Sequence, residues 1–117
     1  MRERSLDSVK TFFADKPRVM RELRDWAADL KERRRDVEKV GLFGSYATDT
    51  YGPHSDADLL IVLRASDKPF RDRIPEFLPE PASVPCDVFP YTADEIERLR
   101  QDDSPWIKHI LQEVVWL

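Results

Sequence analysis

The sequence contains few cysteines and histidines and no long apolar run. Its one cysteine, Cys86, excludes an internal disulfide and a zinc site built from several thiolates. The two histidines, His54 and His109, lie far apart, which disfavours a histidine-based metal site. No apolar run approaches the roughly 20 residues that span a bilayer, and the N-terminus lacks the apolar segment of a signal peptide. We therefore expect a cytoplasmic protein without a membrane partner.

The chain has no excess of positive charge. The 117 residues include 23 acids and 19 Lys or Arg, which gives a formal net charge of −4. A nucleic-acid backbone is held by a broad basic field, so direct DNA or RNA binding is not expected. The basic run at residues 31–36 (KERRRD) contains acids and falls on the polar side of a helical pattern, and we interpret it as a solvated face. The length predicts a single domain, 1–117, with one active surface.

Apolar spacing and capping residues predict the helices. One apolar stripe, of Val19, Leu23, Trp26 and Leu30, indicates a long helix. The expected helices are a short one after Ser5, one from Pro17 to about Arg35, a short one capped by Ser45 and reaching about Thr50, one within residues 69–78 shortened by Pro75, one after the capping box at 92–95, and one opened by Ser104 and Pro105.

Alternating or continuous apolar segments predict the strands. They lie at residues 37–43, 57–63, 84–89 and 114–117, and Pro85 favours an edge position or a strand start for the third. Together these elements predict an α/β (α+β) fold, in which helices flank a small mixed sheet of three or four strands.

Two acids, Asp56 and Asp58, lead directly into the apolar strand 57–63. Residues two apart in a strand point to the same face, so the two carboxylates are expected to be neighbours if the strand begins near Ser55. Like charges at that separation repel unless a cation lies between them. Mg²⁺ prefers oxygen ligands and substrate phosphates, and a third acid, for which Asp87 is the candidate, would be needed for a second ion.

A Gly-Ser pair, Gly44 and Ser45, precedes a short predicted helix. Glycine permits close backbone approach to a ligand, and the free N–H groups at a helix start favour phosphate. The Ser45 hydroxyl adds a donor. Such dipeptides also form ordinary turns, so the pair alone is weak support for a phosphate site.

Taken together, Gly44-Ser45, ten further residues and Asp56-Ala57-Asp58 resemble the minimal nucleotidyltransferases (MNT) of the DNA polymerase β superfamily, whose signature is GSx10DxD. The surrounding LFGSYA and SDADLLIV are similar to that family, as is the chain end WIKHILQEVVWL. The resemblance extends over essentially the whole chain.

The resemblance implies a nucleotidyltransferase fold and a two-metal reaction with ATP. Asp56 and Asp58 would bind both Mg²⁺ ions, Asp87 would complete the second site and help activate the incoming hydroxyl, and Gly44 and Ser45 would hold the triphosphate. An acceptor hydroxyl would attack the α-phosphorus in line and release pyrophosphate, a reaction that depends on positioning and charge neutralisation.

The resemblance also implies a partner. Small members of the family commonly serve as antitoxins of two-gene HEPN/MNT (type VII) toxin–antitoxin modules, where they transfer AMP to a tyrosine of a HEPN-type ribonuclease toxin. This chain has no arginine followed four to six residues later by histidine, the pattern of that toxin, so it would be the antitoxin. The catalytic half of the fold fills the chain, which favours a protein acceptor over an enclosed small molecule.

Two alternatives remain. Thr48-Asp49 stands where many relatives carry Arg-Gly, which motivates a catalytically weak antitoxin that neutralises its partner by binding. A small-molecule nucleotidyltransferase, acting on an acceptor such as an aminoglycoside, is the other, although similar resistance enzymes usually carry a further helical domain. The remaining residues have simpler interpretations. Cys86 is expected to be a small buried hydrophobe, and His109 a surface or packing residue. Trp26, Trp106 and Trp116 are expected to form core or partner surface, and His54 is a candidate for contact with phosphate.

Overall fold

The computed structural model describes residues 16–52, 56–79 and 83–117. Its helices are α2 (Lys16–Arg33), α3 (Ser45–Thr48), α4 (Phe70–Arg73), α5 (Ala93–Gln101) and α6 (Pro105–Glu113), with a 3₁₀ turn, η1 (Ile74–Glu76). Its strands are β1 (Val37–Phe43), β2 (Ala57–Leu63), β3 (Cys86–Thr92) and β4 (Val115–Trp116). The short helix expected after Ser5 lies outside the described residues.

The four strands form one mixed sheet in the order β3-β2-β1-β4. β1 pairs antiparallel with both β2 and β4, whereas β2 and β3 run parallel. The predicted fold class, a small mixed sheet flanked by helices, is confirmed. β3 lies at an edge of the sheet and begins directly after Pro85, as that proline indicated.

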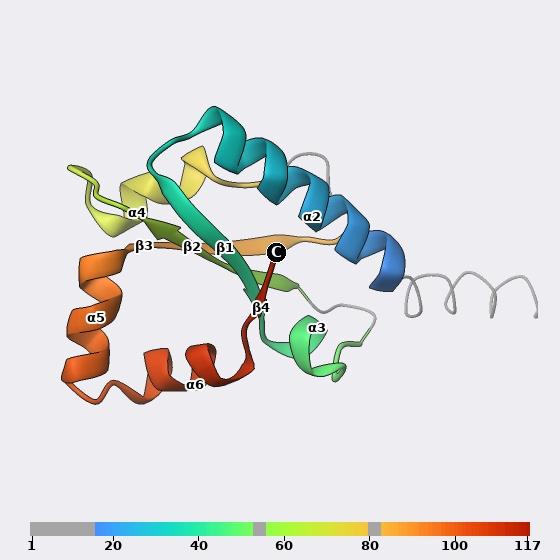
Figure 1. Cartoon of the computed structure of the whole chain (residues 1–117). Helices are drawn as coiled ribbons and strands as arrows, with labels where there is room; N and C mark the ends of the chain where they lie inside the picture. The colour runs from blue at the N-terminus through green and yellow to red at the C-terminus, as the bar shows by residue number, and fades with distance from the viewer. Residues whose placement is uncertain (1–15, 53–55, 80–82) are drawn as a thin grey trace, which may run out of the picture.

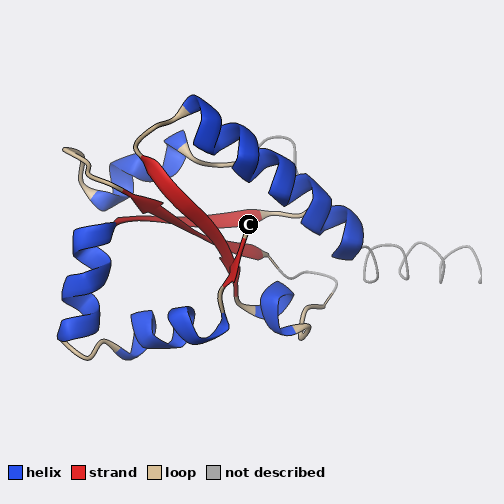
Figure 2. Ribbon diagram, viewed as in Figure 1, coloured by secondary structure: helices blue, strands red, loops and turns tan. Residues whose placement is uncertain are grey.

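Helices cover both faces of the sheet (Figures 1 and 2). One face packs on α2, whose buried residues repeat at helical spacing: Val19, Leu23, Ala27 and Leu30. The other face carries Phe43, Leu60 and Val62 and packs on Ile107 and Ile110 of α6. Because successive strand residues point to opposite faces, the continuous apolar run of β2 fills both cores.

Several element boundaries differ from the predictions for local physical reasons. β3 starts at Cys86 and continues through Pro90 to Thr92, because an edge strand tolerates a residue without an N–H. The helix expected at residues 69–78 is a single turn followed by η1, with Pro75 at the break. Ser45 is the first residue of α3 and Gly44 takes the N-cap position.

Two of the three tryptophans lie at the surface. Trp106 and Trp116 are 43% and 40% exposed, so the core interpretation does not hold for these two. Trp26, on α2, is half-buried against the core. None of the described helices is both long enough and apolar enough to cross a bilayer.

Candidate active site

The predicted acids meet at one end of the sheet, where β2 and β3 begin. Asp58 is the register partner of Phe43 on β1 and of Asp87 on β3. Neighbouring strands lie about 4.8 Å apart, so the parallel pairing places the Asp58 and Asp87 side chains next to each other on one face. Asp56, just before β2, is near enough to Asp87 that it contributes to the raised pKa of the Asp87 carboxyl. The structure thus brings together all three acids that the sequence singled out.

The environment of Asp58 disfavours its charge. Burial, followed by the charges of Asp87, Asp56 and Glu113, raises the pKa of Asp58 to about 6. Burial also raises the pKa of Asp87, and the neighbouring charge of Asp56 acts in the same direction. Both shifts have the sign expected for carboxylates that face one another without a cation.

Among the described residues, no salt bridge neutralises Asp56, Asp58 or Asp87. The same residues contain no group of three or more His, Cys, Asp or Glu side chains arranged to hold a metal ion. A preformed three-carboxylate cage is therefore not present. The donors still suit Mg²⁺, which is usually bound by one or two carboxylates together with the phosphates of the substrate.

Gly44 lies against the Asp58 carboxylate. Its φ of 79° and ψ of −156° lie in a region that is almost exclusive to glycine. A Cβ at this position would lie 2.2 Å from Oδ2 of Asp58. The sequence predicts a ligand in the space beside Gly44, whereas in the structure the Asp58 carboxylate packs there.

Glu113, the last residue of α6, is a member of the site that the sequence argument missed. Its Oε1 accepts a hydrogen bond of 2.7 Å from the Gly44 N–H, and its side chain is 16% exposed. It is 69 positions away in sequence and belongs to no spacing motif with the other acids. Its one local signal is that it is the acid nearest to the apolar chain end VVWL.

The segment after Gly44 is held by polar contacts of its own. The Thr48 hydroxyl donates to the Gly44 carbonyl at 3.2 Å, and Asp49 has a φ of 62°. Lys16, at the start of α2, forms an ion pair with Asp49. The negative charge of Asp49 is therefore compensated within the fold. The Ser45 hydroxyl has no hydrogen-bond partner in the described part of the chain.

The other reactive side chains have structural explanations. Burial, with the charges of Asp56 and Asp87 next in effect, raises the pKa of Cys86 to about 11, so its thiol stays protonated. This confirms Cys86 as a partly buried apolar residue. His109 is exposed on α6, 3.3 Å from Glu113 Oε2. His54 lies outside the described residues.

An aromatic group borders the acids. Phe89 lies two residues after Asp87 and hence on the same face of β3. Its ring centroid is 5.3 Å from that of Phe43 and 5.5 Å from that of Trp106. The Trp106 indole donates a 3.2 Å hydrogen bond to the Tyr91 hydroxyl. Acids and a partly exposed aromatic surface are therefore contiguous.

Comparison with known proteins identifies the family. The family model described as a nucleotidyltransferase domain matches residues 23–116, which include the whole sheet and all the acids above. The chain belongs to the nucleotidyltransferase domain family. Nucleotidyl transfer is the general activity that this membership supports.

A solved structure agrees on the fold. The crystal structure of a candidate nucleotidyltransferase from Sulfolobus solfataricus is similar with a TM-score of 0.63 at 19% identity, over 92% of this chain and 86% of that chain. At this identity the likeness establishes the nucleotidyltransferase fold and leaves the substrate open. No curated protein matches the sequence.

Proposed function

We propose that this nucleotidyltransferase transfers AMP from ATP to a hydroxyl group, a tyrosine, of a partner HEPN-type toxin and so acts as its antitoxin. The observation that carries the transfer step is the register pairing of Asp58 with Asp87 beside Gly44 and Ser45. The HEPN partner and the tyrosine acceptor rest on the resemblance of the GSx10DxD segment to antitoxins of that kind.

Asp56 and Asp58 are assigned as the ligands of Mg²⁺. Their mutual repulsion and the partial burial of Asp58 are costs that a divalent cation would remove. When bound, the ion would neutralise the triphosphate and the charge that develops on the transferred phosphoryl group. Ser45 is assigned to the triphosphate because its hydroxyl is free of partners within the described residues.

Asp87 is assigned to the acceptor. Its raised pKa suits a group that takes a proton, and it is more exposed than Asp58, so an incoming hydroxyl can reach it. In the proposed step the acceptor oxygen bonds to the α-phosphorus of ATP. The bond from that phosphorus to the bridging oxygen breaks, pyrophosphate leaves, and the hydroxyl proton passes to Asp87.

The aromatic surface beside the acids favours a macromolecular acceptor. Trp106 is 43% exposed, and with Phe89 it extends the site along the sheet. Exposed aromatic side chains next to a polar centre are typical of protein-binding surfaces. A surface of this kind fits a tyrosine presented by a folded protein.

The test is label transfer to the protein encoded beside this one. With Mg²⁺, label from α-³²P-ATP should appear on a tyrosine of that partner, and label from γ-³²P-ATP should not. Asp58→Asn and Asp87→Asn should each lower the rate about 100-fold or more, in line with losses of charge-stabilising groups elsewhere. Asp36→Asn is the matched control because Asp36 lies at the other end of the sheet and pairs with Arg34.

Absence of label on the partner, or full activity of Asp58→Asn, would contradict the transfer proposal. If Asp58→Asn still neutralises the toxin in cells, the chain instead acts by binding. That second candidate is favoured by Thr48-Asp49, which supplies no cation for the triphosphate. Turnover of a small hydroxylated acceptor by the isolated protein would point to the small-molecule alternative.

A further inference from the structure

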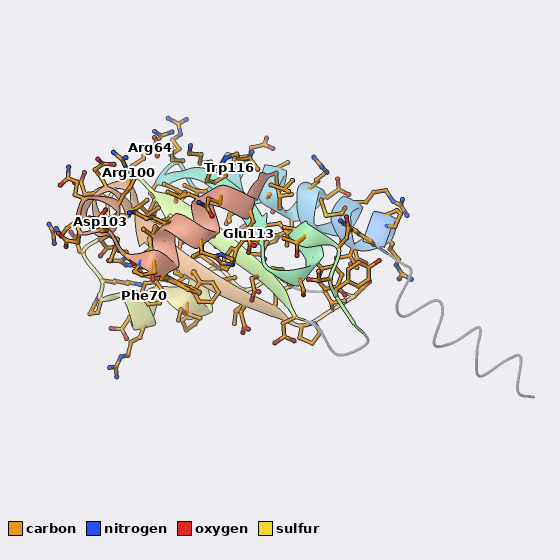
Figure 3. The ribbon with its side chains drawn as sticks, turned by 90° about the horizontal axis from the view of Figure 1, so that it is seen from below. Arg64, Phe70, Arg100, Asp103, Glu113 and Trp116 are labelled. Carbon is orange, nitrogen blue, oxygen red and sulfur yellow. The ribbon has the colours of Figure 1, made fainter. Side chains whose placement is uncertain are left out.

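Glu113 connects the C-terminal helix to the turn between β1 and α3. One carboxylate oxygen accepts from the Gly44 N–H at 2.7 Å, and the other lies 3.3 Å from His109 Nε2. Figure 3 looks onto the face of the sheet that α6 covers, and it labels Glu113 at the end of α6 nearer to α3 and Asp103 near the opposite end. The contact is therefore made at the acid end of the sheet.

The hydrogen bond completes the restraint of Gly44. Its carbonyl accepts from the Ala47 and Thr48 amides at 3.0 and 3.1 Å, and its Cα faces the Asp58 carboxylate. With Glu113 on the N–H, the peptide groups on both sides of Gly44 are fixed. The orientation of Ser45, the next residue, follows from that restraint.

Helix α6 is already anchored without this bond. Ile107 and Ile110 are fully buried, and β4 pairs with β1 through Gly41 and Leu42. A Cβ on Gly41 would come within 2.4 Å of Val114, which shows how tightly the chain end closes on β1.

We propose that Glu113 is a positioning residue of the nucleotide site, which holds the Gly44 N–H so that Ser45 and Asp58 keep the arrangement that receives the triphosphate. The inference rests on the proposed function. It makes α6 and β4 part of the site, and it implies that the Gly44 amide serves the protein rather than the phosphate.

The Gly44 amide can be observed directly. The chain has three glycines, and Phe43-Gly44 is its only Phe-Gly pair. Protein labelled with ¹⁵N-glycine and with phenylalanine carrying a ¹³C carbonyl therefore gives one carbonyl-correlated amide signal, that of Gly44. Glu113→Ala should increase its hydrogen exchange about tenfold, the loss of one hydrogen bond of about 1.4 kcal/mol, whereas Glu113→Gln should keep it protected.

Nucleotide binding gives the second measurement. Titration with Mg²⁺ and a non-hydrolysable ATP analogue, followed on the Gly44 signal, should show Kd about tenfold higher for Glu113→Ala and within about threefold of wild type for Glu113→Gln. His109→Ala is the control, because it removes the partner of Oε2 and leaves the bond to Gly44. In turnover, Glu113→Ala should raise KM for ATP more than it lowers kcat.

The outcomes separate the two proposals. If the wild type neither binds the analogue nor transfers label, the proposed function fails, and the positioning role fails with it. If the wild type binds and Glu113→Ala binds equally well, or Glu113→Gln is as impaired as Glu113→Ala, only the positioning role is overturned. Unchanged exchange of Gly44 in Glu113→Ala would overturn it as well.

Discussion

The two ends of the central sheet differ in whether their acidic side chains are paired with basic ones. Near the start of β2, Asp56, Asp58 and Asp87 lie together without a cation among the described residues. At the other end of β2, a cavity of about 300 Å³ is lined by acids and bases that pair with one another: Arg34, Asp36, Lys68 and Glu76. In Figure 1 the end with the three acids lies near α3, and the end with the paired charges lies near α4.

The pKa values follow this division. Hydrogen bonding to Arg34 lowers the pKa of Asp36, and hydrogen bonding to Arg73 lowers the pKa of Glu95. Burial beside other acids raises the pKa of Asp58 instead. Ionisation of the carboxylates therefore stabilises the fold at the paired end, whereas ionisation of Asp58 at the acid end destabilises it. A site in which buried acids repel one another, with no basic side chain beside them in the described residues, is suited to a cationic ligand.

The largest effect is expected from Arg73→Met at the paired end. Arg73 is 4% exposed and donates to Glu95 at 2.7 Å and to the carbonyl groups of Lys68 and Pro90. Loss of these bonds should lower the free energy of unfolding by about 3 kcal/mol, measured by urea denaturation. Arg71→Met, one exposed position on the same helix, should change it by less than about 0.5 kcal/mol. Equal effects of the two variants would contradict the special role of the buried arginine.

At the acid end, Gly44→Ala should cost about 2 kcal/mol of unfolding free energy, because its φ is strained for any side chain and its Cβ would collide with Asp58. The same denaturation measurement applies. Gly52→Ala is the control, since a Cβ there meets nothing within 4 Å. A variant at position 44 as stable as wild type would show that the turn relaxes.

Asp58→Asn should stabilise the protein at pH 8, by about 1 kcal/mol after allowance for partial exposure. The pKa of Asp58 is about 6 in the fold and about 3.9 in the unfolded chain, so the wild type loses stability as pH rises through this interval. The advantage of the variant should vanish near pH 4, where wild-type Asp58 is protonated in the fold. Thermal unfolding at pH 4, 6 and 8 checks the trend.

The smallest effect is expected from Asp36→Asn, with the opposite sign. The pKa of Asp36 is lowered by Arg34, so its contribution is present above the unfolded pKa of about 3.9 and is lost as pH falls through the folded value. Because the pair is partly exposed, the variant should be less stable by about 0.5 kcal/mol at pH 7. Thermal unfolding in 1 M salt should reduce the difference. A stabilised Asp36→Asn would erase the contrast between the two ends.

Much of this arrangement could be predicted from the sequence, because it depends on local patterns. The apolar run after Asp58 predicts a strand buried on both sides, and β2 contributes to both cores. Asp56 lies before Ala57, the first residue of β2, so the expected strand face shared by Asp56 and Asp58 is not formed. The capping box at Thr92 is formed as predicted, with Glu95 closing it. Strand β1 has the predicted bounds.

The misses concern contacts between distant segments. The bond from Glu113 to Gly44 joins residues 69 positions apart, and neither residue type nor spacing indicates it. The compensation of Asp49 by Lys16 likewise spans 33 positions. The exposure of Trp106 depends on how α6 lies on the sheet, which an apolar stripe alone does not specify.

The sequence by itself determined which residues can carry the chemistry, since strand alternation and the Gly-Ser turn are local properties of the chain. Only the tertiary structure decided how they are combined. The parallel pairing of β2 with β3 brings Asp87 to Asp58, and the packing of α6 brings Glu113 to Gly44. Both depend on burial of apolar surface summed over the whole domain, which no single segment encodes.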